Sequence, residues 1–213
     1  MLAPLGRSLM RFHHRAISVP RVQRIATALT RLVGQRLEGP IGDVLDVGCG
    51  DGALGAKVGR LLGCRVRGVD VLLPSAQQGT AIETERYDGT TLPFEAGQFD
   101  VVLLSDVLHH ARDPLALLRE CFRVSRRAVA LKDHVRFGPV SHGLLWLMDV
   151  TGNAGTGIAV TANYLSWPEW IELLAEAKGR MSAVEWPLEI HGLPWRTITR
   201  SELQFASILE PLP

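Results

Sequence analysis

The stretch Val44-Leu45-Asp46-Val47-Gly48-Cys49-Gly50-Asp51-Gly52 organises the rest of this 213-residue chain. Its first four residues are mostly apolar and β-branched, as is typical of a strand that is covered on both faces. Three glycines at alternate positions then leave a loop with few Cβ atoms, so the backbone can approach a ligand closely. Residues 53–62 follow with apolar side chains at helical spacing. The sequence therefore predicts a strand, a ligand-binding loop and a helix N-terminus.

Two classes of nucleotide cofactor fit such a loop, because a helix N-terminus favours anionic or polar ligands. The spacing Gly48-x-Gly50-x-x-Ala53 meets the dinucleotide fingerprint with its permitted alanine. Asp46, however, lies two residues before the first glycine. A carboxylate there repels a pyrophosphate but can pair with an ammonium group, directly or through water. A ligand with a nucleoside at one end and an amino acid at the other therefore suits the loop better.

At these residues the chain resembles the class I S-adenosylmethionine-dependent methyltransferases, in particular the small bacterial, methyltransferase-11-like kind with the signature Asp-x-Gly-x-Gly-x-Gly. The resemblance extends over about residues 21–209 and is strongest over 44–110. It implies S-adenosylmethionine as cofactor and S-adenosylhomocysteine as its product. The cofactor-binding residues predicted in this way are Asp46, Gly48, Cys49, Gly50, Gly52, Asp70, Val71, Asp88, Gly89, Ser105 and Asp106.

Individual roles follow for some of these residues. Asp70 ends the predicted second strand, where an acid can accept hydrogen bonds from a ribose diol of either NAD or S-adenosylmethionine. The resemblance implies that Asp88 takes the adenine amino group. It also implies that Ser105 and Asp106, which end the apolar strand over 99–106, line the sulfonium end of the cofactor or the mouth of the substrate site.

Composition excludes several other classes of protein. The net charge of +1 gives no support to nucleic-acid binding, which usually needs a basic patch. No apolar run approaches the roughly 18 residues of a membrane span. The three cysteines are widely spaced and suggest neither a disulfide framework nor a zinc site, which favours a reducing cytoplasm.

The predicted architecture is a single α/β domain with a Rossmann-like, doubly wound, seven-stranded and mostly parallel sheet and helices on both faces. Residues 1–38 form a helical segment that packs on the core, and 39–213 form the methyltransferase domain. The first 37 residues contain seven arginines and no acid, so an organelle transit peptide is the alternative for this segment. Residues 135–165 are irregular and rich in glycine, with one short helix, and are interpreted as a lid over the substrate or as an ordinary long crossover.

Candidate catalytic groups follow the predicted fifth strand, 127–131. In open α/β sheets, ligands bind outside the carboxyl ends of the strands. His134 is the favoured general base, and Asp133 is expected to orient its ring. His110 is a further candidate, as is its neighbour His109. No ligand spacing predicts a metal site, although these groups and Asp106 offer suitable atoms.

The sequence thus predicts methyl transfer to an unidentified small-molecule acceptor, with the oligomeric state left open. Methyl transfer from a sulfonium mainly requires proximity and orientation, and a base only when the acceptor must lose a proton. Two alternatives stay open at this point. One is a non-catalytic nucleoside-binding module that serves a partner subunit, and the other is an NAD-dependent oxidoreductase, against which Asp46, Gly52 and Asp88 argue.

Overall fold

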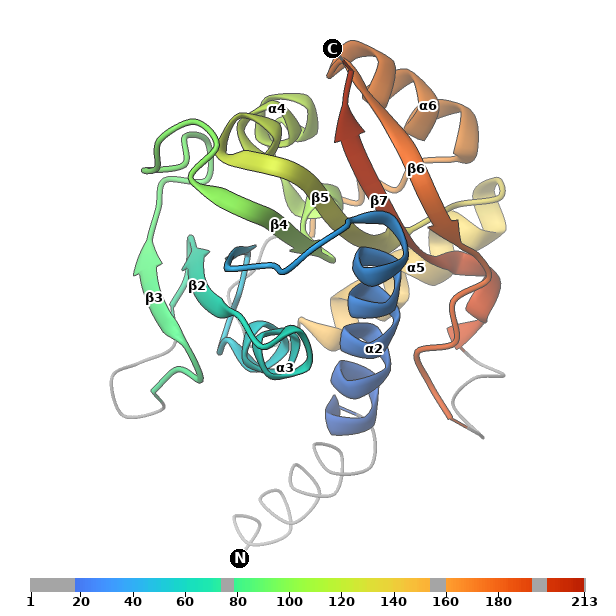
Figure 1. Cartoon of the computed structure of the whole chain (residues 1–213). Helices are drawn as coiled ribbons and strands as arrows, with labels where there is room; N and C mark the ends of the chain where they lie inside the picture. Colours follow the sequence, from blue (N-terminus) through green and yellow to red (C-terminus); the bar gives the residue numbers. More distant parts are fainter. Residues whose placement is uncertain (1–17, 74–78, 154–159, 193–198, 213) are drawn as a thin grey trace, which may run out of the picture.

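The computed structural model of the chain describes residues 18–73, 79–153, 160–192 and 199–212. Within these residues one seven-stranded sheet has the order β3-β2-β1-β4-β5-β7-β6 and lies between helices (Figure 1). Its strands are β1 Asp43–Val47, β2 Arg65–Asp70, β3 Glu83–Arg86, β4 Phe99–Ser105, β5 Ser125–His134, β6 Gly179–Glu185 and β7 Gln204–Pro211. The helices are α2 Val19–Arg36, α3 Ala53–Leu62, α4 Pro114–Val124, α5 Pro139–Gly152 and α6 Trp167–Glu176, with short 3-10 turns η2 Leu108–His110 and η3 Ser201–Leu203. The predicted fold class is confirmed.

Parallel pairing joins β1 to β2 and β4, and extends outward to β3 and β5. β7 runs antiparallel between β5 and β6, so the last two strands close one side of the sheet as an antiparallel pair. The carboxyl ends of the five parallel strands consequently meet at one edge. This edge is where an open α/β sheet binds its ligands.

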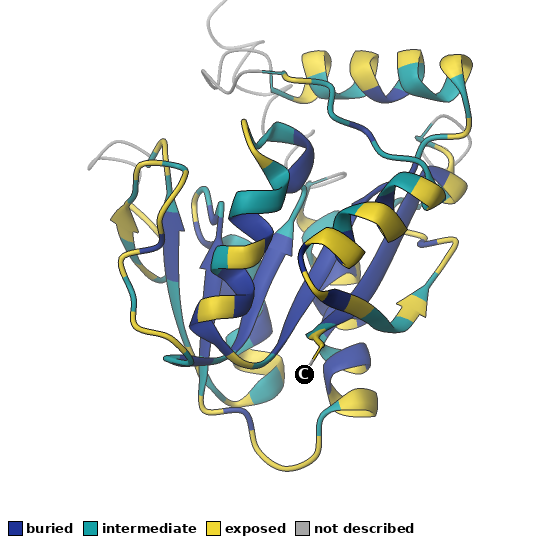
Figure 2. Cartoon of the chain, turned by 90° about the horizontal axis from the view of Figure 1, so that it is seen from above, coloured by how far each residue is buried: buried dark blue, intermediate teal, exposed yellow. Residues whose placement is uncertain are grey.

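The two faces of the sheet have separate apolar cores. Helices α2 and α3 cover one core, which includes Leu29 and Val58. Helices α4 and α6 cover the other, which includes Leu118 and Trp170. Figure 2 shows dark blue, buried strands beneath helices whose outward faces are yellow and exposed. None of the helices in the described ranges is long and apolar enough to cross a membrane.

Strand β5 is longer than the sequence predicts. It continues to His134 because β7 pairs with it up to the register His134↔Gln204. Lys132, Asp133 and His134 therefore belong to the strand instead of following it. Since side chains alternate along a strand, Lys132 and His134 point to one face of the sheet and Asp133 points to the other.

The segment 135–165 is more regular than predicted, because α5 spans 14 residues of it. Leu145 is the only buried residue of this helix, and Val140, Trp146 and Leu147 are exposed. The lid role stays a prediction, as does the division of the chain at residue 38. The arginine-rich residues 1–17 lie outside the described part of the chain.

Candidate functional site

The glycine loop after β1 has the geometry that the sequence predicts. Gly48, Gly50 and Gly52 all have positive φ, at 71°, 54° and 74°, in the left-handed region that other residues rarely adopt. A Cβ on Gly48 would lie only 2.4 Å from Cγ2 of Val107, so this position has no room for a side chain. A Cβ on Gly50 would meet no atom within 4 Å, so the loop is open above this residue.

Gly48→Ala is expected to lower the free energy of unfolding by at least 1–2 kcal/mol, roughly the cost of a left-handed conformation for an L-residue, before the clash with Val107 is counted. Gly34→Ala is the matched control, because Gly34 lies inside α2 with nothing within 4 Å of its added Cβ. That change should raise stability by about 0.5–1 kcal/mol. Urea denaturation of both variants measures the contrast, and equal effects would mean that the loop tolerates a side chain.

Asp46 lies at the end of β1 and is only 2% exposed. Its Oδ2 has no hydrogen-bond partner among the described residues. Burial raises the pKa of this carboxyl group to about 7. A buried acceptor without a partner is costly, so the site is prepared for a cationic or hydrogen-bonding ligand group.

Asp70 and Asp88 hold the neighbouring loops in shape. Asp70 Oδ2 accepts from the backbone N–H of Gly50 at 2.8 Å, and its Oδ1 accepts from Leu72 at 2.9 Å. The exposed Asp88 accepts from the backbone N–H groups of the two threonines that follow Gly89, Thr90 at 2.8 Å and Thr91 at 2.9 Å. These bonds lower the pKa of Asp88. The predicted contacts of both acids with ribose and adenine stay predictions.

The remaining predicted cofactor residues lie around the same loop. The Sγ of Cys49 would be 2.6 Å from a Cβ on Gly68, so this thiol fills the space against β2. Burial raises its pKa to about 12. Val71 is 39% exposed and lies against Gly89, whose added Cβ would be 3.1 Å from it. Ser105 ends β4 beside the loop.

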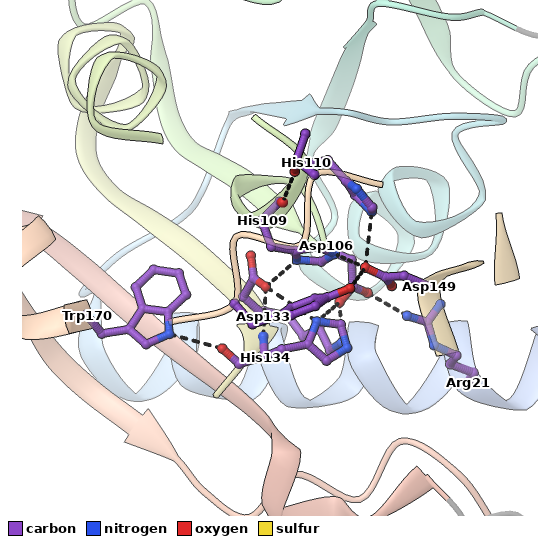
Figure 3. Close-up of polar contacts among 11 residues, drawn as sticks. Arg21, Asp106, His109, His110, Asp133, His134, Asp149 and Trp170 are labelled. Atoms are coloured by element: carbon purple, nitrogen blue, oxygen red, sulfur yellow. Dashed lines mark hydrogen bonds and ion pairs between the residues drawn. The ribbon is translucent and has the colours of Figure 1, made fainter. Parts of the chain in front are cut away.

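A second group of polar side chains gathers beyond this loop, as Figure 3 shows. Its members come from α2, the end of β4, η2, β5 and α5, and they are largely buried although several are charged. They are Arg21, Asp106, His109, His110, Lys132, Asp133, His134 and Asp149. Such a concentration of ionisable groups at the binding edge of the sheet indicates a functional site.

Asp133 pairs more closely with His109 than with His134, whose ring it is predicted to orient. Its Oδ1 lies 2.6 Å from Nδ1 of His109, whereas Nδ1 of His134 is 3.5 Å away. The reason is the alternation along β5, which places the Asp133 side chain on the face beneath η2. Although burial opposes the charged form, the Asp133 carboxylate raises the pKa of His109 to about 10.

His134 lies on the opposite face of β5 and is 6% exposed. Burial and the ammonium group of Lys132 lower its pKa to about 4, so the ring is neutral at physiological pH. Its Nδ1 is 3.5 Å from Oδ1 of both Asp106 and Asp133. Two nearby carboxylates favour a proton on Nδ1, which leaves the lone pair of the ring on Nε2. Trp170 fixes the strand here by donating to the His134 carbonyl at 3.0 Å.

Asp106 is held by two cations in this structure. Arg21 of α2 lies 2.5 Å from Oδ2, and Lys132 binds Oδ1. Although burial opposes ionisation, Lys132 and Arg21 keep the pKa of Asp106 well below its usual value. Asp106 also has a positive φ of 58°, which is uncommon outside glycine. The residue therefore ties α2 to the carboxyl end of β5, and its predicted contact with the cofactor stays a prediction.

Two functional candidates were not predicted from the sequence. Asp149 of α5 accepts from the hydroxyl group of Tyr164 at 2.5 Å and faces the two histidines of η2. Gln204 is 1% exposed, and neither its side-chain oxygen nor its nitrogen has a hydrogen-bond partner among the described residues. Its register opposite His134 places it at the same site, a contact that only the β5–β7 pairing reveals.

A family model described as a methyltransferase domain matches residues 45–131, the segment from β1 to β5. This segment is a methyltransferase domain. The match includes the glycine loop, η2 and most of β5, and it confirms the resemblance drawn from the loop. The rest of the polar site, including Asp133, His134 and Asp149, lies beyond the matched segment.

Curated relatives are similar to part of this chain. A ubiquinone biosynthesis O-methyltransferase of Psychrobacter cryohalolentis is 37% identical over 94 residues, which cover 38% of this chain and 35% of that protein. One from Cupriavidus pinatubonensis is 32% identical over 119 residues, covering 51% of this chain and 46% of that protein. The aligned part of the chain thus spans less than half of the length of each of these two relatives.

Solved structures extend the likeness of the fold to more of the chain. A putative methyltransferase of Haloferax volcanii, in complex with the Trm112 methyltransferase activator, has a TM-score of 0.66 at 16% identity and covers 100% of this chain and 96% of its own. A geranyl diphosphate methyltransferase solved with geranyl diphosphate and sinefungin has a TM-score of 0.60 at 20% identity, covering 86% of this chain and 76% of its own. The Rossmann-like methyltransferase fold therefore includes β6 and β7.

Proposed function

We propose that this chain transfers the methyl group of S-adenosylmethionine to a hydroxyl group of a small-molecule acceptor. The single observation that carries the proposal is the buried Asp46 carboxylate, whose Oδ2 has no partner, beside a loop of three positive-φ glycines. An α-ammonium group would satisfy this oxygen, and a pyrophosphate would not. The names of the curated relatives support the oxygen as the accepting atom.

The residues of the loop fit this cofactor. Asp46 offers its unpartnered oxygen to the amino-acid end, and the open space above Gly50 admits the ligand. Asp70, which ends β2, and Asp88, which follows β3, are the proposed partners of the ribose and the adenine. The bound cofactor supplies an electrophilic methyl carbon. The protein then needs to place the acceptor oxygen in line with it and exclude water.

His134 is the proposed base for the acceptor hydroxyl group. As the oxygen attacks the methyl carbon, the bond from carbon to sulfur breaks and its electron pair stays on sulfur. The hydroxyl proton passes to Nε2 of His134. Asp106 and Asp133, each with Oδ1 3.5 Å from Nδ1, stabilise the imidazolium that forms.

Gln204 is proposed to bind the acceptor through its side-chain amide. Gln204→Met keeps the length of the side chain but removes an amide that has no partner, and should therefore raise the free energy of unfolding by about 1–3 kcal/mol. The KM for the acceptor should rise by about 2- to 10-fold, the loss of one neutral hydrogen bond. Thermal unfolding and steady-state kinetics measure the two effects. A variant that is less stable and has an unchanged KM would show that the amide has a structural partner.

The proposed function is tested by following an isotopically labelled methyl group from S-adenosylmethionine into hydroxylated aromatic acceptors with apolar substituents. We expect transfer by the purified chain alone, with product that carries the label on oxygen. Transfer that requires a second protein would support the alternative of a module that serves a partner subunit. Label on carbon or nitrogen alone would refute the assignment of the hydroxyl group.

A further inference from the structure

Two histidines and one aspartate converge above the sheet, apart from the glycine loop. His109 and His110 are consecutive in η2, and Asp149 comes from α5 (Figure 3). Oδ2 of Asp149 lies 3.3 Å from Nε2 of His109 and 3.9 Å from Nε2 of His110. Ligand atoms that share one Zn²⁺ ion at about 2.1 Å in tetrahedral geometry are about 3.4 Å apart. The three groups thus need little movement to bind one ion.

We propose that His109, His110 and Asp149 form a binding site for a divalent transition-metal ion. Nε2 of His109 supports this assignment, because it is buried and has no hydrogen-bond partner among the described residues. It lies 3.3 Å from Oδ2 of Asp149, within ion-pair distance.

The other face of His109 has the partner that metal-binding histidines usually have. Its Nδ1 is 2.6 Å from Oδ1 of Asp133, which is completely buried in β5. Carboxylate–histidine pairs of this kind direct Nε2 at the metal, and an ion that binds there would displace the proton that Nε2 holds in the metal-free protein. Thr161 further holds η2 by donating to the carbonyl of His109. Asp133 is therefore a positioning residue for this site.

A second combination of nearby groups is less suitable. This combination is His109 with Asp106, Asp133 and His134. Each of these residues offers one ligand atom, and these atoms all lie within 4.8 Å of one another. However, Arg21 and Lys132 already bind the two oxygens of Asp106, and Oδ1 of Asp133 accepts from the backbone of His134 at 2.7 Å. A metal ion there would have to displace two cations.

The chemistry of the ligands indicates which ions would bind. Two imidazoles and one carboxylate suit Zn²⁺, Fe²⁺ and related ions, whereas Mg²⁺ and Ca²⁺ prefer oxygen ligands. The side chains of His110 and Asp149 are 16% and 12% exposed. Three protein ligands leave at least one coordination position for an outside molecule. The sequence does not suggest this site, because adjacent histidines have no ligand spacing and Asp149 is 39 residues away from His110.

Titration of the metal-free protein with Co²⁺, followed by visible absorption and by equilibrium dialysis, tests the proposal. We expect one equivalent to bind, with ligand-field bands in the visible range, and Zn²⁺ to displace it. Asp149→Asn and His110→Ala should each weaken binding by more than about 100-fold, and Asp133→Asn by about 10- to 100-fold, as is usual for the partner of a ligand. Circular dichroism of each variant shows that it is folded.

His142→Ala is the matched control, because His142 lies on α5 with Asp149 but is not one of the three proposed ligands. This variant should bind Co²⁺ with the affinity of the wild type. The absence of saturable binding by the wild type would overturn the proposal. The proposal would also be overturned if His134→Ala abolished Co²⁺ binding and His110→Ala left it intact. These measurements need neither the cofactor nor an acceptor, so their failure is distinct from failure of the proposed methyl transfer.

Discussion

Asp46→Asn is expected to lower the affinity for S-adenosylmethionine by about 10- to 150-fold and to stabilise the cofactor-free protein. The loss of affinity corresponds to about 1.5–3 kcal/mol, the usual contribution of a hydrogen bond to a charged group. The gain in stability arises because the carboxylate is buried without a partner for Oδ2. Isothermal titration calorimetry and thermal unfolding measure the two effects.

The stability effect depends on pH in a defined direction. The pKa of Asp46 rises from 3.8 to about 7 in the folded protein, so the folded state binds more protons than the unfolded state between these values. The wild type therefore loses part of its free energy of unfolding as the pH rises from 3.8 to about 7. At pH 8 the asparagine variant should be more stable by roughly 2–4 kcal/mol, and at pH 4 the difference should nearly vanish.

Asp43→Asn is the control for this prediction. Asp43 begins the same strand, but its side chain is 39% exposed and pairs with Arg65 at 3.0 Å. This change should leave the affinity for S-adenosylmethionine unaltered. An Asp46→Asn variant with wild-type affinity would remove Asp46 from the amino-acid end of the cofactor.

His134→Ala is expected to lower the rate of methyl transfer about 100-fold or more, the scale of general-base catalysis, while the cofactor affinity stays nearly unchanged. His134→Gln should lower the rate as well, because glutamine can form a hydrogen bond but cannot take the proton. The lowered pKa of about 4 keeps the ring neutral, so its ionisation should not shape the rate of the wild type between about pH 6 and 9.

Rapid-quench measurement of a single turnover tests the role of His134, since it separates chemistry from product release. Variants that transfer the methyl group at the wild-type rate across this pH range would show that His134 is structural. The acceptor would then lose its proton to another group or need no base.

Local sequence patterns were sufficient to predict the parallel half of the fold. The helix over 53–62 has the predicted bounds, and Asp113 caps α4 through a bond from Ala116 at 2.9 Å. A capping box of Ser166 and Glu169 opens α6. These features depend on neighbours within a few residues, which is why periodicity and capping rules reveal them.

The polar site could be predicted only in part, because long-range pairing decides it. Strand β5 extends to His134 because β7, about 70 residues later, pairs with it. The strand conformation in turn decides the face of the sheet on which the side chain of Asp133 lies. The partnership of Asp133 with His109 and the approach of Asp149 from α5 have no local signal. Sequence reasoning found Asp133 and His134 as candidates but did not identify His109 as the closer partner of the acid.

Calorimetric comparison of S-adenosylhomocysteine with NAD, on the same preparation of wild-type protein, tests the central claim most directly. Both ligands contain an adenosine unit, for which Asp70 and Asp88 are the proposed partners, but only S-adenosylhomocysteine carries an α-ammonium group for Asp46. We predict saturable binding of S-adenosylhomocysteine with one molecule per chain and little or no binding of NAD. Saturable binding of NAD with no binding of S-adenosylhomocysteine would contradict the account.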